Sequence, residues 1–412
     1  MIAVLAASFL AVGAGAGPVE NEVKALIAKR VAVDPRLISV VVAVERGNER
    51  AVVGWGTPKP DGDTVFEIGS VTKVFTARLL ADLAGSGQAA LDDPAESLRP
   101  NGRLPRSAKG TRFTLRHLAQ HRSGLPRLPD NMPMADPLNP YADYTPALLD
   151  AFLSSYKLPV EPGTKAEYSN LGYGLLGALL AEQAGTDYAS LVQTRIAGPL
   201  GMTSTAVKWA GPMAQGHMLG GASVPNWDLN ALAGAGELKS TANDLLKFLA
   251  DTAAKPGVPL GWIDEGFLWH NGQTGGFSSF IGFSRATGSK VVVLSNVSVS
   301  LDDVGRHLLD ASKPLSTTPP IYPEVPVARA LLDEYAGSYE LAPGLIITIR
   351  RVGDGLTAQL TDQPEFRVFA SSQTDFFFKV VDASLTFHRD ASGRVAKLVL
   401  HQNGDQDARR LP

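Results

Sequence analysis

The pattern of hydrophobic and polar positions predicts strands near both ends of the segment 17–315 and helices between them. Alternating or continuous apolar runs bounded by turn residues are typical of strands, and apolar residues recurring every three or four positions are typical of helices. Helical spacing dominates from about Leu79 to Phe248. The predicted strands are Ile38–Val44, Arg50–Trp55, Thr64–Ile68, Gly261–His270, Ser278–Ser284 and Lys290–Asn296.

Strands at both ends of this segment predict one antiparallel sheet flanked by helices, including a final helix over 301–309. The intervening helices would form a separate lobe, with a cleft where the lobe meets the sheet. The fold class predicted for this part of the chain is therefore α+β.

The C-terminal part differs in texture. The proline-rich stretch 316–326 predicts a linker, and a short helix over 328–335 follows it. Closely spaced strands with Gly- and Asp-bearing turns then predict a small all-β, barrel-like domain over 327–412. Its predicted strands are 345–351, 356–360, 366–370, 376–381, 385–388 and 395–401.

The N-terminus predicts an exported protein. Ile2–Val12 is a short apolar run, and Ala14-Gly15-Ala16 fits a small-residue cleavage site, so 1–16 is predicted as a signal peptide. The run is too short to span a bilayer comfortably. No basic residue precedes the run, and a buried N-terminal helix is the alternative.

Composition excludes several classes of function. The chain has 412 residues, a net charge of −3 with acids and bases interspersed, and no cysteine. There is no basic stripe for nucleic acid and no basic amphipathic helix for a membrane surface. Without cysteine there are no disulfides, thiolate metal sites or cysteine nucleophiles. We expect no cofactor and no metal, and the oligomeric state is left open.

Ser70 and Lys73 form the first candidate for chemistry. Gly69 permits a sharp entry into a helix, and Ser70 and Lys73 would stand on one face of its first turn. Free N–H groups there suit an oxyanion, and a lysine of lowered pKa can activate a serine hydroxyl. The alternative is a capping serine with a solvated lysine. A second match, Ser154 with Lys157, lies near a helix C-terminus, where the dipole is unfavourable.

Two further segments carry candidate partners. Near a lysine, the phenol of Tyr168 would lose its proton more readily, and it could exchange a proton with Ser70 or a leaving group. The amide of Asn170 suits a contact to a substrate amide and to Lys73. The alternative is a helix start with a core tyrosine.

The third segment is His270-Asn271-Gly272-Gln273 at the end of a predicted strand. Its glycine lets a substrate backbone lie close, and the N–H of Gln273 could join that of Ser70 in a two-donor hole for a carbonyl oxygen. His270 could bind a carboxylate or relay a proton near neutral pH. The alternative is a glycine-rich hairpin with a surface histidine.

Taken together, these motifs resemble the serine β-lactamase and penicillin-binding protein superfamily over about residues 20–312. The Tyr-x-Asn motif resembles its class C side, with the DD-carboxypeptidases and family VIII esterases. The motifs that match in order and rough spacing are Ser70-Val71-Thr72-Lys73, Tyr168-Ser169-Asn170 and His270-Asn271-Gly272. Further similar stretches are His117–Pro126, Pro199–Met202 and Gly234–Thr241.

The resemblance implies an acylated Ser70, an acid–base pair of Lys73 and Tyr168, and a substrate-amide contact at Asn170. It implies a serine acyl hydrolase of D-alanyl peptides or β-lactams, taking a small molecule or a peptidoglycan peptide. A carboxylesterase is the alternative, and a non-catalytic peptidoglycan-binding homologue is a third reading. The family usually has Lys-Thr-Gly where this chain has His270-Asn271-Gly272, which puts efficient cephalosporin hydrolysis in doubt. The C-terminal module resembles barrel domains appended to related serine hydrolases.

Two other enzyme classes receive little support. His117 and His121 are four residues apart, as in zinc-binding helices, but Leu118 stands where the catalytic glutamate of such a motif would be. The Gly-x-Ser-x-Gly motif of α/β-hydrolases is absent from the sequence.

Overall fold

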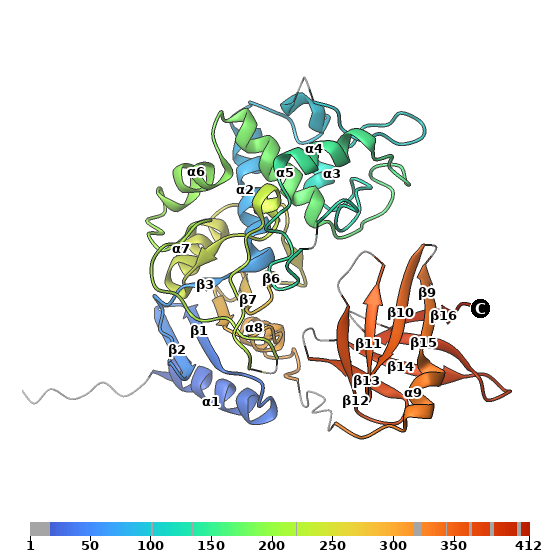
Figure 1. Cartoon of the computed structure of the whole chain (residues 1–412). Helices are drawn as coiled ribbons and strands as arrows, with labels where there is room; N and C mark the ends of the chain where they lie inside the picture. The colour runs from blue at the N-terminus through green and yellow to red at the C-terminus, as the bar shows by residue number, and fades with distance from the viewer. Residues whose placement is uncertain are drawn as a thin grey trace, which may run out of the picture.

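A computed structural model shows an α+β domain followed by a closed β-barrel, which confirms the predicted fold class (Figure 1). The predicted signal peptide lies outside the described residues, as does most of the predicted linker. The described residues are 17–99, 102–133, 135–219, 221–316, 324–342, 344–361, 365–379, 383–401 and 405–412.

The first domain is built on a six-stranded antiparallel sheet with strand order β2-β1-β8-β7-β6-β5. As predicted, strands from the two ends of the domain pair directly, since β1 lies between β2 and β8. The strands are β1 Ser39–Arg46, β2 Glu49–Gly56, β5 Ile263–Asp264, β6 Leu268–Gln273, β7 Ser278–Phe283 and β8 Lys290–Ser295, and a separate pair joins β3 Phe66–Glu67 to β4 Lys239–Ser240.

Alternation along the strands divides the buried side chains between two faces of the sheet. Val40 and Val42 of β1 pack with helices α1 (Pro18–Val33) and α8 (Asp302–Leu309) on one face. Val41, between them, packs into the larger core on the other face, which joins the sheet to the helical lobe. A residue's position along a strand thus decides whether its side chain can reach the lobe.

The helical lobe combines short helices with long loops, so the predicted mostly helical region is less regular than expected. Figure 1 shows α2 running from the sheet into this lobe beside α5. The elements are η1 Gly69–Val71, α2 Thr72–Gly85, η2 Ala95–Leu98, α3 Leu115–Ala119, α4 Pro146–Ser155, α5 Asn170–Gln183, α6 Tyr188–Val192, η3 Gln193–Ala197, η4 Asn230–Ala235 and α7 Ala242–Ala253.

The C-terminal domain is a closed antiparallel barrel preceded by α9 (Arg329–Tyr335). Aromatic rings fill its interior, with Tyr335 stacked on Phe387 at 4.1 Å between centroids. The strands, in barrel order, are β10 Leu345–Val352, β11 Gly355–Leu360, β12 Phe366–Ala370, β13 Asp375–Phe378, β14 Ser384–Arg389, β15 Val395–His401, β16 Asp405–Arg410 and β9 Gly337–Ala342.

Two sequence-based expectations about strands were wrong or incomplete. The segment predicted as one strand, Gly261–His270, is two: β5 and β6 are separated by a turn at Gly266, where φ is +85°. The barrel contains β9 and β16, which were not predicted, and their pairing closes it. Only Ala408 of β16 is buried, so this strand lacks the apolar alternation on which the prediction depended.

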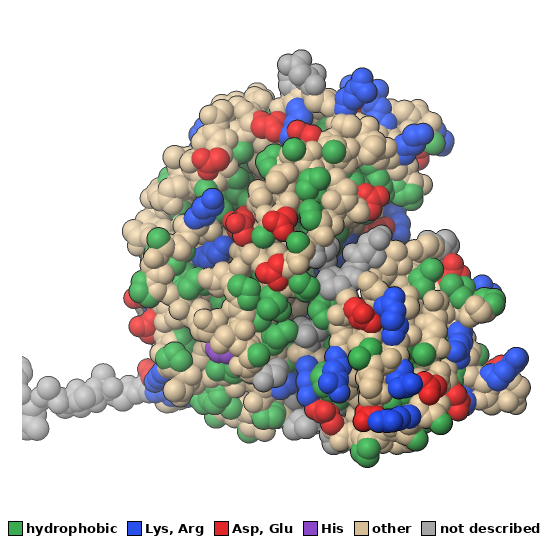
Figure 2. Space-filling view, in the orientation of Figure 1, with side chains coloured by type: hydrophobic (Ala, Val, Ile, Leu, Met, Phe, Trp, Pro, Cys, Tyr) green, Lys and Arg blue, Asp and Glu red, His purple; other side chains and the backbone are tan. Residues whose placement is uncertain are grey.

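The surface carries both signs of charge. In the view of Figure 2, acidic and basic side chains are interspersed over both domains. None of the helices in the described ranges is long and apolar enough to cross a membrane.

A pair of glycine substitutions tests the packing of α8 on the sheet. A Cβ at Gly305 would lie 2.2 Å from Cδ1 of Phe280, a ring only 1% exposed, whereas a Cβ at Gly85 of α2 meets nothing within 4 Å. We expect Gly305→Ala to destabilise the first domain by about 1–3 kcal/mol through overpacking. Gly85→Ala should be neutral or slightly stabilising, because alanine favours helix.

All five tryptophans precede the linker, so tryptophan fluorescence during urea unfolding reports on the first domain alone. Equal unfolding midpoints for the two variants would show that α8 can move away from Phe280 without loss.

Candidate active site

Three segments distant in sequence meet around the hydroxyl of Ser70. Ser70 lies in η1, at the entry to α2; Tyr168 and Asn170 lie at the start of α5; and β6 runs alongside η1. The hydroxyl of Ser279 on β7 donates to the carbonyl of Ile68 at 2.8 Å, which anchors the turn before Ser70 to the sheet. The structure thus brings the three predicted motifs together.

The side chain of Lys73 is fully buried, with 0% of its surface exposed. Its Nζ lies 2.9 Å from Ser70 Oγ, 2.9 Å from Asn170 Oδ1 and 2.7 Å from the carbonyl oxygen of Ala235. Burial, reinforced by the nearby positive charge of Arg127, holds the pKa of Lys73 well below its usual value. The neutral amine is therefore favoured, as required of a proton acceptor.

Tyr168 approaches the serine from the other side. Its hydroxyl donates to Ser70 Oγ at 2.6 Å, and its ring lies 4.7 Å from Lys73 Nζ, measured to the centroid. Burial raises the pKa of the Tyr168 phenol, although the hydrogen bond to Ser70 and the charge of Arg127 act in the opposite direction. The expected easier loss of its proton was therefore wrong: burial outweighs the neighbouring charges, and the phenol stays a donor.

The side-chain amide of Asn170 bridges Lys73 and Tyr141. Its Oδ1 accepts from Lys73, and its Nδ2 donates to the hydroxyl of Tyr141 at 3.1 Å. Its backbone N–H donates to the carbonyl of Arg127 at 3.0 Å, which fixes the start of α5 against the preceding loop. Because Asn170 is already held at both ends of its amide, its orientation relative to Ser70 is well defined.

The third motif, on β6, approaches Ser70 through its backbone. A Cβ at Gly272 would lie 2.1 Å from the carbonyl oxygen of Ile68 and 2.7 Å from Ser70 N, so only glycine permits this approach of β6. A Cβ at Gly69, where φ is +48°, would lie 2.8 Å from Gln273 N. The N–H groups of Ser70 and Gln273 therefore belong to two chain segments in direct backbone contact, while the Gln273 side chain is exposed.

His270 and Asn271 point to opposite faces of β6. His270 faces the lobe and is 5% exposed; burial and the charge of Lys73 lower its pKa to about 4. The ring is therefore neutral at neutral pH, contrary to the expectation of a carboxylate-binding or proton-relaying histidine. Its Nδ1 lies 2.6 Å from the carbonyl oxygen of Asn271.

Asn271 was predicted to bind substrate, and this was wrong. Its Nδ2 donates to Asp302 Oδ2 of α8 at 2.6 Å, on the face of the sheet away from Ser70. The alternation of side chains along a strand excludes it from the site.

The other motif residues have structural contacts. His117 Nδ1 accepts from the N–H of Thr114, and His121 Nδ1 accepts from the N–H of Ser169 at 3.0 Å. Within the described ranges there is no group of three metal-ligating side chains. Ser154 of the second Ser-x-x-Lys match is exposed, and its hydroxyl donates to the carbonyl of Asp150.

Sequence reasoning missed four groups around the site. Tyr141 and Arg127 lie on loops, and the Arg127 guanidinium carbon is 5.2 Å from the centroid of the Tyr168 ring. Ala235 contributes only its carbonyl, which no side-chain pattern can reveal. Glu237 is buried, and burial raises its pKa to about 7. The signal for Glu237 was its place in the stretch Gly234–Thr241, which resembles the family but was given no role.

Family models match both domains of the chain. The family model described as Beta-lactamase matches residues 23–312, and a second model, a domain of unknown function (DUF3471), matches residues 323–411. Among curated relatives, D-alanyl-D-alanine-carboxypeptidase/endopeptidase AmpH of Escherichia coli is 30% identical over 261 residues, 61% of this chain. The match spans 64% of that relative's length, which is less than two thirds.

Penicillin-binding protein 4* of Bacillus subtilis is 25% identical over 408 residues, covering 84% of this chain and 87% of the relative. A solved β-lactamase/D-alanine carboxypeptidase from Yersinia pestis has a TM-score of 0.61 at 23% identity, covering 71% of this chain and 97% of the other. An octameric penicillin-binding protein homologue from Pyrococcus abyssi has the same TM-score at 22% identity, covering 94% and 99%. These two likenesses show the fold, and the family model spans most of the first domain: the chain belongs to the beta-lactamase family.

Proposed function

We propose that the protein is a serine acyl hydrolase that works through an acyl-enzyme on Ser70 and acts on D-alanyl peptides or β-lactams. The observation that carries this proposal is the pair of contacts to one hydroxyl: Lys73 Nζ at 2.9 Å and Tyr168 OH at 2.6 Å. A nucleophile between a buried amine and a phenol has both a proton acceptor and a proton donor at hand.

The direction of each hydrogen bond follows from the protonation states. A neutral Lys73 has two N–H groups, and the oxygens of Asn170 and Ala235 can only accept, so they take both. The lone pair of Nζ is then left for the Ser70 hydroxyl. Tyr168, still protonated, donates to the same Oγ. In this arrangement Ser70 hands its proton to Lys73 as Oγ attacks the substrate carbonyl.

The remaining steps balance within the same residues. The carbonyl oxygen gains negative charge and accepts from the N–H groups of Ser70 and Gln273. As the bond to the leaving group breaks, Tyr168 gives its proton to the departing nitrogen or oxygen, and the proton held by Lys73 restores the phenol. Water then attacks the acyl-enzyme by the reverse sequence, freeing Ser70 and the acid product.

Two relatives support the choice of substrate, because their names describe D-alanyl-D-alanine carboxypeptidase activity and penicillin binding. Peptidoglycan peptides lie outside the cell membrane, so export of the protein, periplasmic or secreted, is part of the same proposal. A second candidate is esterase activity on small esters. It is favoured by the neutral, buried His270, which offers no cation at β6 for a substrate carboxylate.

The nucleophile is tested by a matched pair of serine substitutions. Ser70→Ala should abolish hydrolysis of nitrocefin, a D-Ala-D-Ala peptide and p-nitrophenyl esters, because the acyl-enzyme cannot form. Ser154→Ala, in the other Ser-x-x-Lys, should leave all three rates unchanged. Purified variants compared across this panel also rank the substrate classes, and turnover retained by the Ser70 variant would refute the assignment.

Removing one hydroxyl tests the role of Tyr168. Tyr168→Phe keeps the ring and deletes the donor to Ser70, so we expect kcat/KM to fall on the order of 10²-fold or more, as loss of general acid–base catalysis does. Tyr156→Phe, a tyrosine stacked on Phe152 in the helical lobe, is the control. Equal rates for the two variants would remove the phenol from the mechanism.

The acidic limb of the pH profile should report Lys73. The rate rises with pH as Lys73 loses its proton, at a pKa well below the usual lysine value. Arg127 disfavours the protonated amine, so Arg127→Gln should raise the pKa of Lys73 and move the limb to higher pH.

Glu237→Gln is the control for this measurement, since Glu237 has a pKa of about 7 and could generate such a limb itself. The histidines at 121 and 270, with pKa values of about 3 and about 4, titrate too low to account for a limb nearer neutrality. A limb that disappears in the Glu237 variant and stays fixed in the Arg127 variant would contradict the assignment to Lys73.

A further inference from the structure

The cations around the proposed nucleophile differ sharply in whether they are free to bind a substrate. Among the described residues, three cations show this difference: Lys73, Lys239 and Arg127. Lys73 is buried, and its three contacts serve Ser70, Asn170 and Ala235.

Lys239 is also engaged. It is 7% exposed, and its Nζ donates to the carbonyl of Trp227 at 3.2 Å. Burial raises the pKa of the carboxyls of Glu67 and Glu237, and the charge of Lys239 opposes that rise. A cation that balances two buried acids is not available to a ligand.

Arg127 is different in each respect. Its side chain is exposed, and no carboxylate within the described part of the chain pairs with it. Its guanidinium carbon lies 5.2 Å from the centroid of the Tyr168 ring, which is within cation–π range, and the hydroxyl of that ring contacts Ser70. A single aromatic ring therefore separates this free cation from the nucleophile.

The backbone fixes the position of Arg127 relative to the site. Its carbonyl accepts the N–H groups of Asn170 at 3.0 Å and Leu171 at 3.2 Å, the first residues of α5. The charge of Arg127 is felt by the side chains around Ser70, since it lowers the pKa of Lys73 and opposes the raised pKa values of Tyr141 and Tyr168.

We propose that Arg127 binds a carboxylate on the acyl portion of the substrate and so selects acidic acyl donors. This inference rests on the proposed function, because it takes Ser70 as the acylated residue and Asn170 as the contact to the acyl-side amide. The N–H of Asn170 donates to the carbonyl of Arg127, so Arg127 adjoins the residue taken as the acyl-side contact, whereas the neutral His270 lies on β6. A guanidinium is suited to this role because its fork of N–H donors matches a carboxylate.

The test uses peptides that differ by one charge. Nα-acetyl-Glu-D-Ala-D-Ala and Nα-acetyl-Gln-D-Ala-D-Ala are nearly isosteric and place the difference on the acyl side. We expect wild-type kcat/KM to favour the glutamyl peptide by about two- to fivefold, the range for an exposed ion pair. Isothermal titration of the Ser70→Ala variant should show the same preference in binding, independent of turnover.

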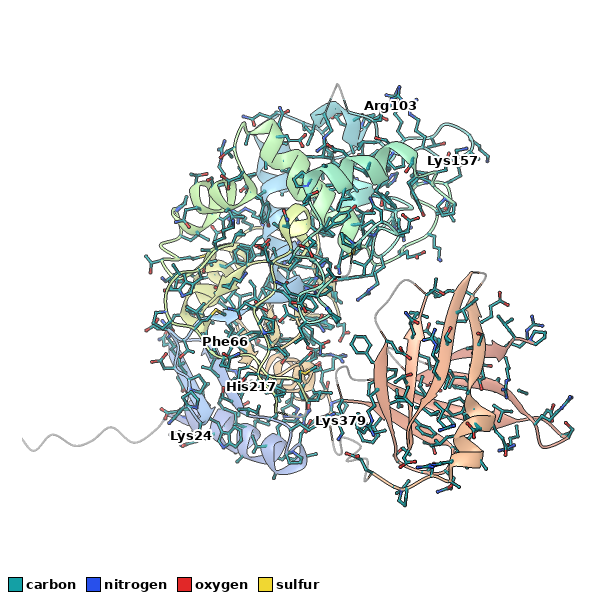
Figure 3. All side chains as sticks on the ribbon, viewed as in Figure 1. Lys24, Phe66, Arg103, Lys157, His217 and Lys379 are labelled. Atoms are coloured by element: carbon teal, nitrogen blue, oxygen red, sulfur yellow. The ribbon has the colours of Figure 1, made fainter. Side chains whose placement is uncertain are left out.

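Arg127→Gln should abolish this preference, and Arg127→Lys should retain part of it. The ratio of kcat/KM for the two peptides is measured on the plateau of the pH profile, where the rate does not depend on the pKa of Lys73. Arg103→Gln is the matched control, because Arg103 is an exposed arginine at the outer end of the helical lobe, away from Phe66 of β3 beside the site (Figure 3).

The outcomes separate this inference from the proposed function. If Ser70→Ala binds both peptides equally or binds neither, or if the preference survives in Arg127→Gln, the inference is wrong. If a C-terminal amide on the glutaminyl peptide alters binding and the glutamyl group does not, the anion is recognised on the leaving-group side, which also overturns it. If the wild-type protein binds the glutamyl peptide preferentially but turns over no substrate, the catalytic role of Ser70 is wrong and the binding role of Arg127 stands.

Discussion

The site depends on the burial of one lysine. Lys73 is fully enclosed, and the three oxygens around its Nζ come from η1, α5 and the end of η4. Burying an ammonium ion is unfavourable, so the fold favours the neutral amine, the state that the proposed base for Ser70 requires. This burial requires η1, α5 and η4 to pack together, so the neutral state of Lys73 depends on the folded lobe.

Glycines make that packing possible by removing side chains where backbones meet. Gly69 and Gly272 allow η1 to lie against β6. Gly177 of α5 and Gly234 of η4 do the same on the other side, where a Cβ on either would lie 2.9 Å from the Cα of its partner. This second contact places the carbonyl of Ala235 beside Lys73. The position of the proposed base thus depends on backbone contacts between glycines, which have no side-chain functional group.

The sequence predicted the sheet, the lobe and the barrel because long apolar runs and turn residues report burial and chain reversal. It did not predict β16, whose side chains are mostly exposed, because a strand that closes a barrel through backbone pairing needs no apolar alternation. The split between β5 and β6 was missed for a related reason, since a single glycine turn interrupts an otherwise continuous apolar stretch.

The site residues that were predicted correctly depend on local sequence, and those that were predicted wrongly depend on tertiary structure. The pairing of Ser70 with Lys73 is local and readable from helical spacing. The inclusion of Asn271 was wrong because the face to which a strand residue points depends on register with neighbouring strands. The protonation of Tyr168 was misjudged because a neighbouring charge is visible in sequence, whereas the extent of burial is known only once the lobe is folded around it.

The third motif is His270-Asn271-Gly272 instead of the Lys-Thr-Gly usual in the family, and β6 still lies beside Ser70. With Asn271 bonded to Asp302 and His270 neutral, β6 presents its backbone beside Ser70, and the proposed contact to the substrate is the N–H of Gln273. Backbone donors act on any substrate carbonyl, so this side of the site is suited to catalysis in general rather than to selecting a ligand by charge. The exposed charge lies on the α5 side, with Arg127. The proposed mechanism therefore assigns acyl transfer and substrate selection to different segments, so that one can change while the other is kept.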